Sequence, residues 1–106
     1  MAKQQKPATR AIRIQTTKTS QKEHSSPVFL TSSFTYDSAE DMAAAFATET
    51  PEVNIYSRFA NPGVDEFVHK MISLEGAEHG VATGTGMAAI FSTFMAFLSK
   101  GDHIIS

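Results

Sequence analysis

A glycine-rich turn within residues 80–90 is the part of the chain most able to do chemistry. Its sequence, GVATGTGMAAI, predicts a short strand, a turn and the first turn of a helix. Such a helix start directs free backbone N–H groups and the positive end of the helix dipole at one point. An anion binds well there, most often a phosphate. We therefore expect a phosphate site at this turn.

Three interpretations of the turn compete. The spacing Gly84-x-Gly86-x-x-Ala89 fits the loose fingerprint of dinucleotide-binding proteins, but that fingerprint also needs an acidic residue after the next strand. Asp102 precedes the expected strand instead. A mononucleotide loop is less favoured, because no Gly-Lys-Ser/Thr follows. The turn could also serve only to let a helix and a strand pack closely.

A second set of chemically capable residues is Tyr56-Ser57-Arg58, followed by Phe59-Ala60-Asn61-Pro62. In an extended segment, residues two apart point to the same side, so Tyr56 and Arg58 would face one target. A guanidinium grips phosphate with two parallel hydrogen bonds, and a phenol adds a third donor. The alternative is a tyrosine packed on a loop and an arginine in a surface ion pair, and spacing alone favours that alternative.

Other catalytic patterns are missing from the sequence. There is no cysteine, hence no thiolate chemistry, and no Gly-x-Ser-x-Gly nucleophile elbow. The histidines have no metal-ligand spacing, and we expect no metal site; they are His24, His69, His79 and His103.

The elements that must position these residues follow from local signals. Residues 1–26 have no helical or strand period and are expected to form an extended arm. Ser38, with Asp41 three residues on, predicts a helix start, and that helix should end before Pro51. Residues 27–31 and 34–36 are expected to be short extended pieces, and 52–60 a loop.

Asn61-Pro62-Gly63 predicts the start of a longer helix that Gly76 ends. We expect Glu66 and Lys70 to pair on its solvent side. Its apolar residues recur at helical spacing; they are Val64, Phe67, Val68, Met71 and Ile72.

Residues 81–83 and 102–106 are expected to be strands on either side of a helix over 87–98. Strand, helix and strand at this spacing form a βαβ unit, so we predict an α/β fold with a parallel sheet. The helix over 87–98 has no charged residue on any face and requires cover on all sides. We therefore expect the N-terminal piece of a larger protein; the alternative is a complete domain that oligomerises through this helix.

Composition narrows the function further. The net charge of −2 implies no general affinity for nucleic acid, and no apolar run is long enough to span a bilayer. The basic residues before Glu23 indicate either a solvated terminus or an arm that docks on an acidic partner, such as another copy of the chain. They are also compatible with a transit peptide, although the amphipathic pattern is weak; they are Lys3, Lys6, Arg10, Arg13, Lys18 and Lys22.

From about residue 9 onward the sequence resembles the Cys/Met-metabolism family of pyridoxal-phosphate (PLP) enzymes of fold type I. The motifs that carry the resemblance appear in the family's order; they are PVFLTSSF at 27–34, IYSRFANP at 55–62, LEGAE at 74–78, GTGMAA at 84–89 and GDH at 101–103. The family includes cystathionine γ-synthase, cystathionine lyases, methionine γ-lyase and homoserine-ester sulfhydrylases. Within this family, the motifs are most similar to those of the branch that uses O-succinylhomoserine.

The resemblance implies a set of site residues and partners. In the family, backbone N–H groups at the Gly86 and Met87 positions bind the PLP phosphate. The Tyr56 and Arg58 positions reach the phosphate of a neighbouring subunit, and the tyrosine also takes part in chemistry at the substrate's γ-carbon. The resemblance further implies a cytoplasmic homotetramer built as a dimer of dimers, an amino-acid substrate and neither nucleic-acid nor membrane partners. Residues 1–60 would be the arm and inter-subunit segment, and 61–106 the start of the large PLP-binding domain.

Two departures from the family pattern matter. Gly63 stands where many members have threonine. More seriously, the lysine that forms the Schiff base is missing, because neither Lys70 nor Lys100 lies in the Ser-x-Thr-Lys-like context that the family has. Since PLP chemistry needs that group, we expect this piece alone to be inactive. The other interpretations are a γ-lyase of the same family, a nicotinamide enzyme, and a non-catalytic fragment that associates with full-length subunits.

Overall fold

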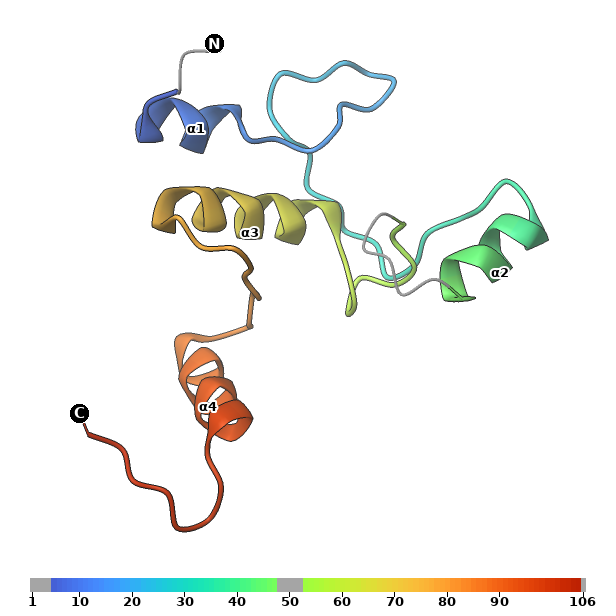
Figure 1. Cartoon of the computed structure of the whole chain (residues 1–106). Helices are drawn as coiled ribbons and strands as arrows, with labels where there is room; N and C mark the ends of the chain where they lie inside the picture. The colour runs from blue at the N-terminus through green and yellow to red at the C-terminus, as the bar shows by residue number, and fades with distance from the viewer. Residues whose placement is uncertain (1–4, 48–52, 106) are drawn as a thin grey trace.

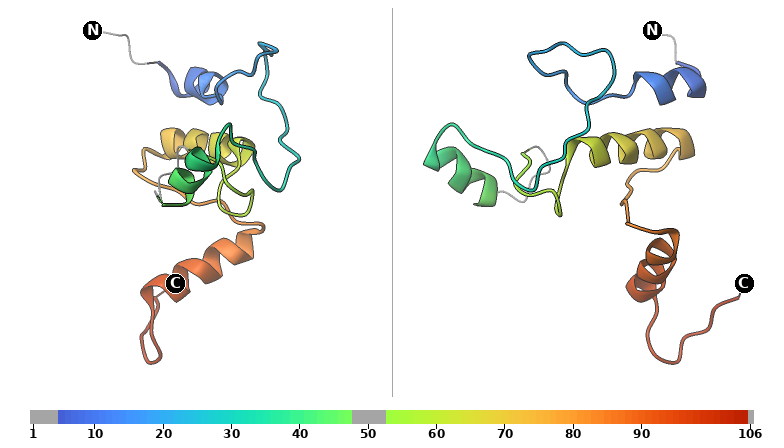
Figure 2. Two further views of the ribbon diagram at one scale, coloured as in Figure 1. Left: turned by 90° about the vertical axis from the view of Figure 1, so that its right-hand side faces the viewer. Right: turned by 180° about the vertical axis from the view of Figure 1, so that it is seen from behind.

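The computed structural model describes residues 5–47 and 53–105 and consists of helices joined by irregular segments (Figure 1). The helices are α1 (Pro7–Arg13), α2 (Ala39–Ala47), α3 (Pro62–Glu75) and α4 (Gly86–Phe97). Within the described ranges, α1 and α3 are the one pair of helices that pack against each other. Figure 2 shows α2 and α4 standing away from this pair.

Three predicted helices are confirmed, and the starts of α2 and α3 and the end of α3 follow the expected capping chemistry. The backbone N–H of Asp41 donates to Ser38 Oγ at 3.0 Å, so Ser38 caps α2. Asn61 caps α3, where its side chain accepts from the N–H of Gly63. Gly76 ends α3 in the left-handed conformation, with φ +68°. The expected end of α2 before Pro51 falls outside the described residues.

The prediction of an extended arm is wrong for residues 7–13, which form α1. Pro7 occupies the first turn, where its fixed φ suits a helix and its missing N–H costs nothing. Arg10 and Arg13 lie in the last turn, where positive charge complements the helix dipole. Because so short a helix is marginal alone, the packing of α1 on α3 supplies the rest of its stability.

The strand predicted at 81–83 is not formed, and neither is the described part, 102–105, of the strand predicted at 102–106. Residue 106 lies outside the described residues. Its one β-type pairing is an isolated antiparallel bridge between Ser33 and Tyr56. A strand requires a neighbour that accepts its backbone hydrogen bonds, and these segments have none among the described residues. The parallel sheet therefore stays a prediction.

The molecule is open and has almost no core. Its radius of gyration is 17.5 Å, whereas a compact domain of this length would have about 13 Å. Ala45 is the one buried apolar residue in the described ranges, and α4 leaves large side chains in solvent, with Phe97 81% exposed. An exposed apolar helix of this kind is typical of an interaction surface that another part of a protein buries.

No described helix has both the length and the apolar content that crossing a bilayer requires.

Candidate functional site

The N-terminus of α4 presents the free backbone amides that the glycine turn predicts. Thr85, the N-cap, is extended at φ −150° and ψ 156°. Its Oγ1 accepts from the N–H of Ala88 at 3.1 Å, and its carbonyl accepts from the N–H of Ala89 at 3.2 Å. The first bond satisfies one of the free amides of the first helical turn, and the second is the first regular bond of the helix. The amides of Gly86 and Met87 have no acceptor within the described ranges and are free for a ligand.

The surroundings of these two amides are open. A Cβ built at Gly84 or at Gly86 would meet nothing within 4 Å, and Met87 is 70% exposed. The hydroxyl of Thr83 donates to the Thr85 carbonyl at 2.8 Å, which orients the turn before the helix. Both amides are therefore accessible at the positive end of the helix dipole.

Tyr56 and Arg58 lie together, but through a turn and not through the extended segment that the sequence predicts. The carbonyl of Tyr56 accepts from the N–H groups of Phe59 and Ala60 at 2.8 and 3.2 Å. The chain must reverse here because it leaves the bridge at Tyr56 and then enters α3. The predicted extended geometry of residues 56–58 is therefore wrong. Residues 56–60 form a turn, which we call the Arg58 turn.

The Arg58 guanidinium rests over two aromatic rings. Its Cζ lies 5.2 Å from the centre of the Tyr56 ring and 5.4 Å from that of Phe59. The two rings meet edge to face, with centroids 6.4 Å apart. Arg58 has no carboxylate partner in the described part of the chain, so it is not in a surface ion pair there. Its charge is held by aromatic faces and stays available for an anion.

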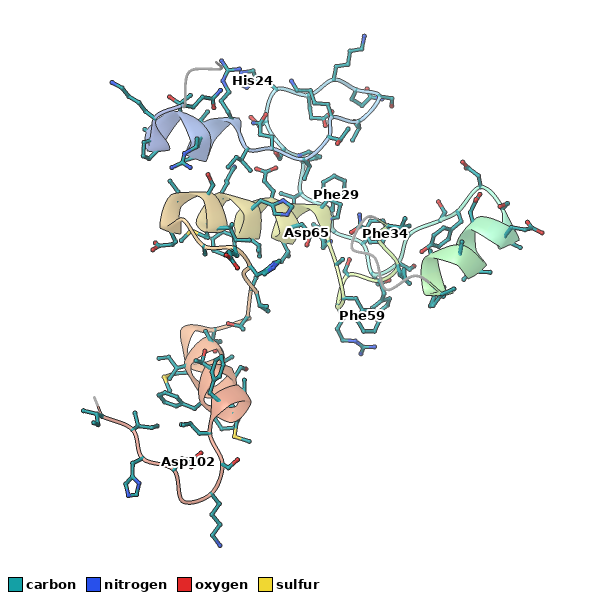
Figure 3. The ribbon with its side chains drawn as sticks, in the orientation of Figure 1. His24, Phe29, Phe34, Phe59, Asp65 and Asp102 are labelled. Carbon is teal, nitrogen blue, oxygen red and sulfur yellow. The ribbon has the colours of Figure 1, made fainter. Side chains whose placement is uncertain are left out.

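The two halves of the expected phosphate grip do not meet. Phe59, which marks the Arg58 turn, lies away from α4 (Figure 3). Helix α4 contacts none of the other described helices. One chain in this arrangement therefore offers the amides of α4 and the cation of the Arg58 turn on separate elements, although Ser57 and Thr83, which lie near them, line the same open cavity.

No group of three or more metal-ligating side chains gathers within residues 5–47 and 53–105.

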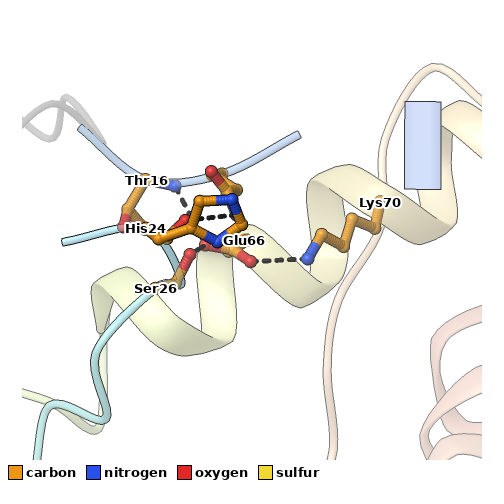
Figure 4. Close-up of polar contacts among 6 residues, drawn as sticks. Thr16, His24, Ser26, Glu66 and Lys70 are labelled. Atoms are coloured by element: carbon orange, nitrogen blue, oxygen red, sulfur yellow. Dashed lines mark hydrogen bonds and ion pairs between the residues drawn. The ribbon is translucent and has the colours of Figure 1, made fainter. Parts of the chain in front are cut away.

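Glu66 holds the N-terminal segment onto α3, a role that sequence reasoning missed (Figure 4). One of its carboxylate oxygens accepts from the N–H of Thr16 at 2.9 Å and from the hydroxyl of Ser26. The other accepts from Lys70 Nζ at 2.6 Å. The pairing with Lys70 was predicted, but the solvent-side placement is wrong, because Glu66 is only 8% exposed. No local signal reveals this burial, since Thr16 and Ser26 lie 50 and 40 residues away.

The contacts around Glu66 make it an acid-sensitive anchor. The hydrogen bond from Lys70, followed by that from Ser26, lowers the pKa of Glu66 from 4.5 to about 2. A lowered carboxyl pKa stabilises the folded form above the unfolded value, and this contribution is lost as the pH falls. The anchor is therefore intact above about pH 4.5 and is lost progressively as the pH falls toward 2.

Glu66→Gln is expected to release the segment between Thr16 and Ser26. Because a buried charge-assisted contact is lost, trypsin should cleave after Lys18 and Lys22 about tenfold faster. Glu75→Gln is the matched control, since Glu75 lies on the same helix but is exposed. Equal cleavage rates in the two variants would show that Glu66 does not hold the segment.

Comparison with known proteins places these features in a family. The family model described as "Cys/Met metabolism PLP-dependent enzyme" matches residues 8–106. An O-succinylhomoserine sulfhydrylase from Pseudomonas aeruginosa is 44% identical over 97 residues, which are 92% of this chain and 24% of that protein. L-methionine gamma-lyases from Fusobacterium nucleatum and Pseudomonas putida are 41% and 42% identical, over 76% and 74% of this chain and 20% of each relative.

This chain therefore spans about a quarter or less of the length of these relatives. The family uses pyridoxal 5'-phosphate, which removes the nicotinamide interpretation of the glycine turn. The match covers both the Arg58 turn and the start of α4. The chain belongs to the Cys/Met-metabolism family of PLP-dependent enzymes.

Proposed function

We propose that this chain is the N-terminal part of a PLP-dependent trans-sulfuration enzyme. The full protein would convert O-succinylhomoserine or O-acetylhomoserine, with a sulfur nucleophile, into homocysteine by replacement at the γ-carbon. The observation that carries the proposal is the pair of free amides at Gly86 and Met87 in a chain of this family. The 44% identity to a sulfhydrylase supports the choice of reaction.

The residues at the start of α4 fit the phosphate group of PLP. Two unpartnered N–H donors at a helix N-terminus are suited to a dianion, and the open space at Gly86 lets it approach the backbone. When bound, PLP supplies an electron sink that stabilises carbanions next to the amino group. The chain's own contribution is to hold and orient that group with Gly86 and Met87.

Arg58 and Tyr56 would complete the grip from a neighbouring subunit. Their separation from α4 within one chain supports a site shared between two copies. Arg58 offers a two-pronged donor without a competing carboxylate among the described residues. The Tyr56 phenol would donate a further hydrogen bond and lie near the substrate's γ-carbon, where a proton must move.

We assign the Schiff base to neither Lys70 nor Lys100. Lys70 is committed to Glu66 at 2.6 Å, and Lys100 follows the end of α4. This supports the view that residues 1–106 alone are inactive. Residues 1–60 would form the arm and inter-subunit segment, and 61–106 the start of the large PLP-binding domain, within a cytoplasmic dimer of dimers. The lack of cysteine fits that location.

The experiment that tests the reaction is a product assay on the full-length protein. With O-succinylhomoserine and sulfide, the proposal expects homocysteine as the main product. A ketoacid with ammonia would instead favour methionine or cystathionine γ-lyase activity, and cystathionine formed from cysteine would favour cystathionine γ-synthase. The resemblance of the methionine γ-lyases, at 41% and 42%, keeps the γ-lyase as the second candidate.

The alternative of another class is a non-catalytic fragment. Such a chain would enter oligomers of full-length subunits and add no activity of its own. Mixing purified residues 1–106 with the full-length protein separates the two ideas. Co-migration without a change in PLP content per full-length subunit would support the fragment interpretation.

A further inference from the structure

The buried side chain of Asn61 forms three hydrogen bonds. It is 8% exposed, although it is polar and belongs to a loop. Its Oδ1 accepts from the N–H of Gly63 at 3.0 Å and so caps α3. Its Nδ2 donates to the Phe29 carbonyl at 3.1 Å and to Ser57 Oγ at 3.0 Å. Both donors and the acceptor of the amide are therefore used, and the cap accounts for only one of these bonds.

Ser57 carries the connection from Asn61 to the segment 29–33. Its backbone N–H donates to the Ser32 carbonyl at 2.9 Å, and its hydroxyl donates to the Thr31 carbonyl. The bridge between Ser33 and Tyr56 lies beside these bonds. Segment 29–33 is thus fastened to the Arg58 turn at Tyr56, Ser57 and Asn61.

The fastened positions flank Arg58 on both sides. Between Ser57 and Asn61 the chain projects the exposed residues Arg58 and Phe59. An exposed arginine that must reach an anion on another chain loses rotational and backbone freedom on binding. A backbone that is fixed before binding reduces that loss. The aromatic rings of Tyr56 and Phe59 also restrict the guanidinium before binding.

We infer that Asn61, acting through Ser57, is a positioning residue that presets Arg58 for the phosphate. Helix capping explains the bond to Gly63, but it does not explain the two bonds from Nδ2. The inference rests on the proposed role of Arg58 in binding PLP phosphate. It adds that the grip depends on a buried amide that touches neither cofactor nor substrate.

The test separates capping from positioning in the full-length enzyme. Asn61→Asp keeps the Oδ1 acceptor of the cap, since aspartate and asparagine cap equally well, but it removes the Nδ2 donors. Ser57→Ala removes the relaying hydroxyl without adding charge. Each variant is expected to weaken PLP binding roughly three- to tenfold, the range for one or two neutral hydrogen bonds. Ser57→Thr keeps a hydroxyl and should restore most of the affinity, while Ser32→Ala is the control for a nearby serine.

A double-mutant cycle with Arg58→Ala distinguishes positioning of Arg58 from a purely structural role. It compares the loss of PLP affinity caused by each substitution in the presence and absence of Arg58. If Asn61 acts through Arg58, then Asn61→Asp and Ser57→Ala cause no further loss once Arg58 is gone. Equal loss with and without Arg58 would overturn the inference, as would unchanged affinity in both variants. If Arg58→Ala alone leaves PLP affinity unchanged, the proposed phosphate role fails instead, so the two failures are distinguishable.

Discussion

Arg58→Ala in the full-length protein is expected to weaken PLP binding roughly 10- to 150-fold, the effect of losing about 1.5–3 kcal/mol from a charged hydrogen-bonded contact. The reason is that Arg58 keeps its charge over the rings of Tyr56 and Phe59 without a carboxylate partner in the described ranges. A PLP titration of the apoenzyme, followed by absorbance, measures the change. The fold should be unaffected, because Arg58 is exposed.

Two controls define what Arg58 contributes. Arg58→Lys keeps the charge but loses the planar fork, so an intermediate affinity is expected. Lys22→Ala removes a positive charge from the N-terminal segment and should leave the affinity unchanged. If Arg58→Ala binds PLP as tightly as the unaltered protein, then Arg58 is a surface residue and the phosphate role is wrong.

Gly86→Pro is expected to weaken PLP binding by a similar factor, because it deletes one of the two free amides. Gly86 is the first residue of α4, where proline fits the helix and loses no intrahelical bond. The preceding Thr85 is extended at φ −150° and ψ 156°, the conformation that a following proline requires. Loss of a hydrogen bond to a charged phosphate corresponds to roughly tenfold or more in affinity.

Gly86→Ala is the matched control for this substitution. It adds a Cβ, which meets nothing within 4 Å in this chain, but it keeps the N–H. We expect Gly86→Ala to bind PLP much more tightly than Gly86→Pro. Equal affinity in the two variants would mean that the Gly86 amide does not contact the phosphate, and that the glycine serves close packing elsewhere.

The helix boundaries were predictable because their signals lie within a few residues. Asn61, Pro62 and Gly76 specify the two ends of α3 through local hydrogen bonds and backbone preference alone. Thr85 specifies the start of α4 in the same way, within one residue of the expected position. The free amides of the candidate site follow directly from that local geometry, so this half of the site could be derived from sequence.

What could not be derived depends on distant partners. Helix α1 has a proline and two arginines in favourable places, but its stability comes from packing on α3. The burial of Glu66 requires Thr16 and Ser26, which arrive from a segment with no regular period. The strands at 81–83 and 102–105 need neighbours to accept their hydrogen bonds, and spacing does not supply them.

The Arg58 turn was predicted from the sequence in part. The sequence predicts that Tyr56 and Arg58 share a target, and the structure places them side by side. The predicted route, alternation along an extended segment, is wrong, because a turn brings the guanidinium over the ring. Residue type therefore indicated the partners, while the backbone geometry came from the contacts of Ser57 and Asn61 with segment 29–33.

Subunit mixing tests most directly whether the phosphate is held by Arg58 from one subunit and by the Gly86 amide from another. Arg58→Ala and Gly86→Pro subunits are dissociated, mixed and reassembled, and tight PLP binding is then measured per subunit. In each mixed dimer with shared sites, one site carries both changes and the other carries neither. We therefore expect tight binding to return at roughly half the sites of the mixed dimers. If both residues act within one subunit, every site keeps a defect, and the absence of any recovery would contradict the account.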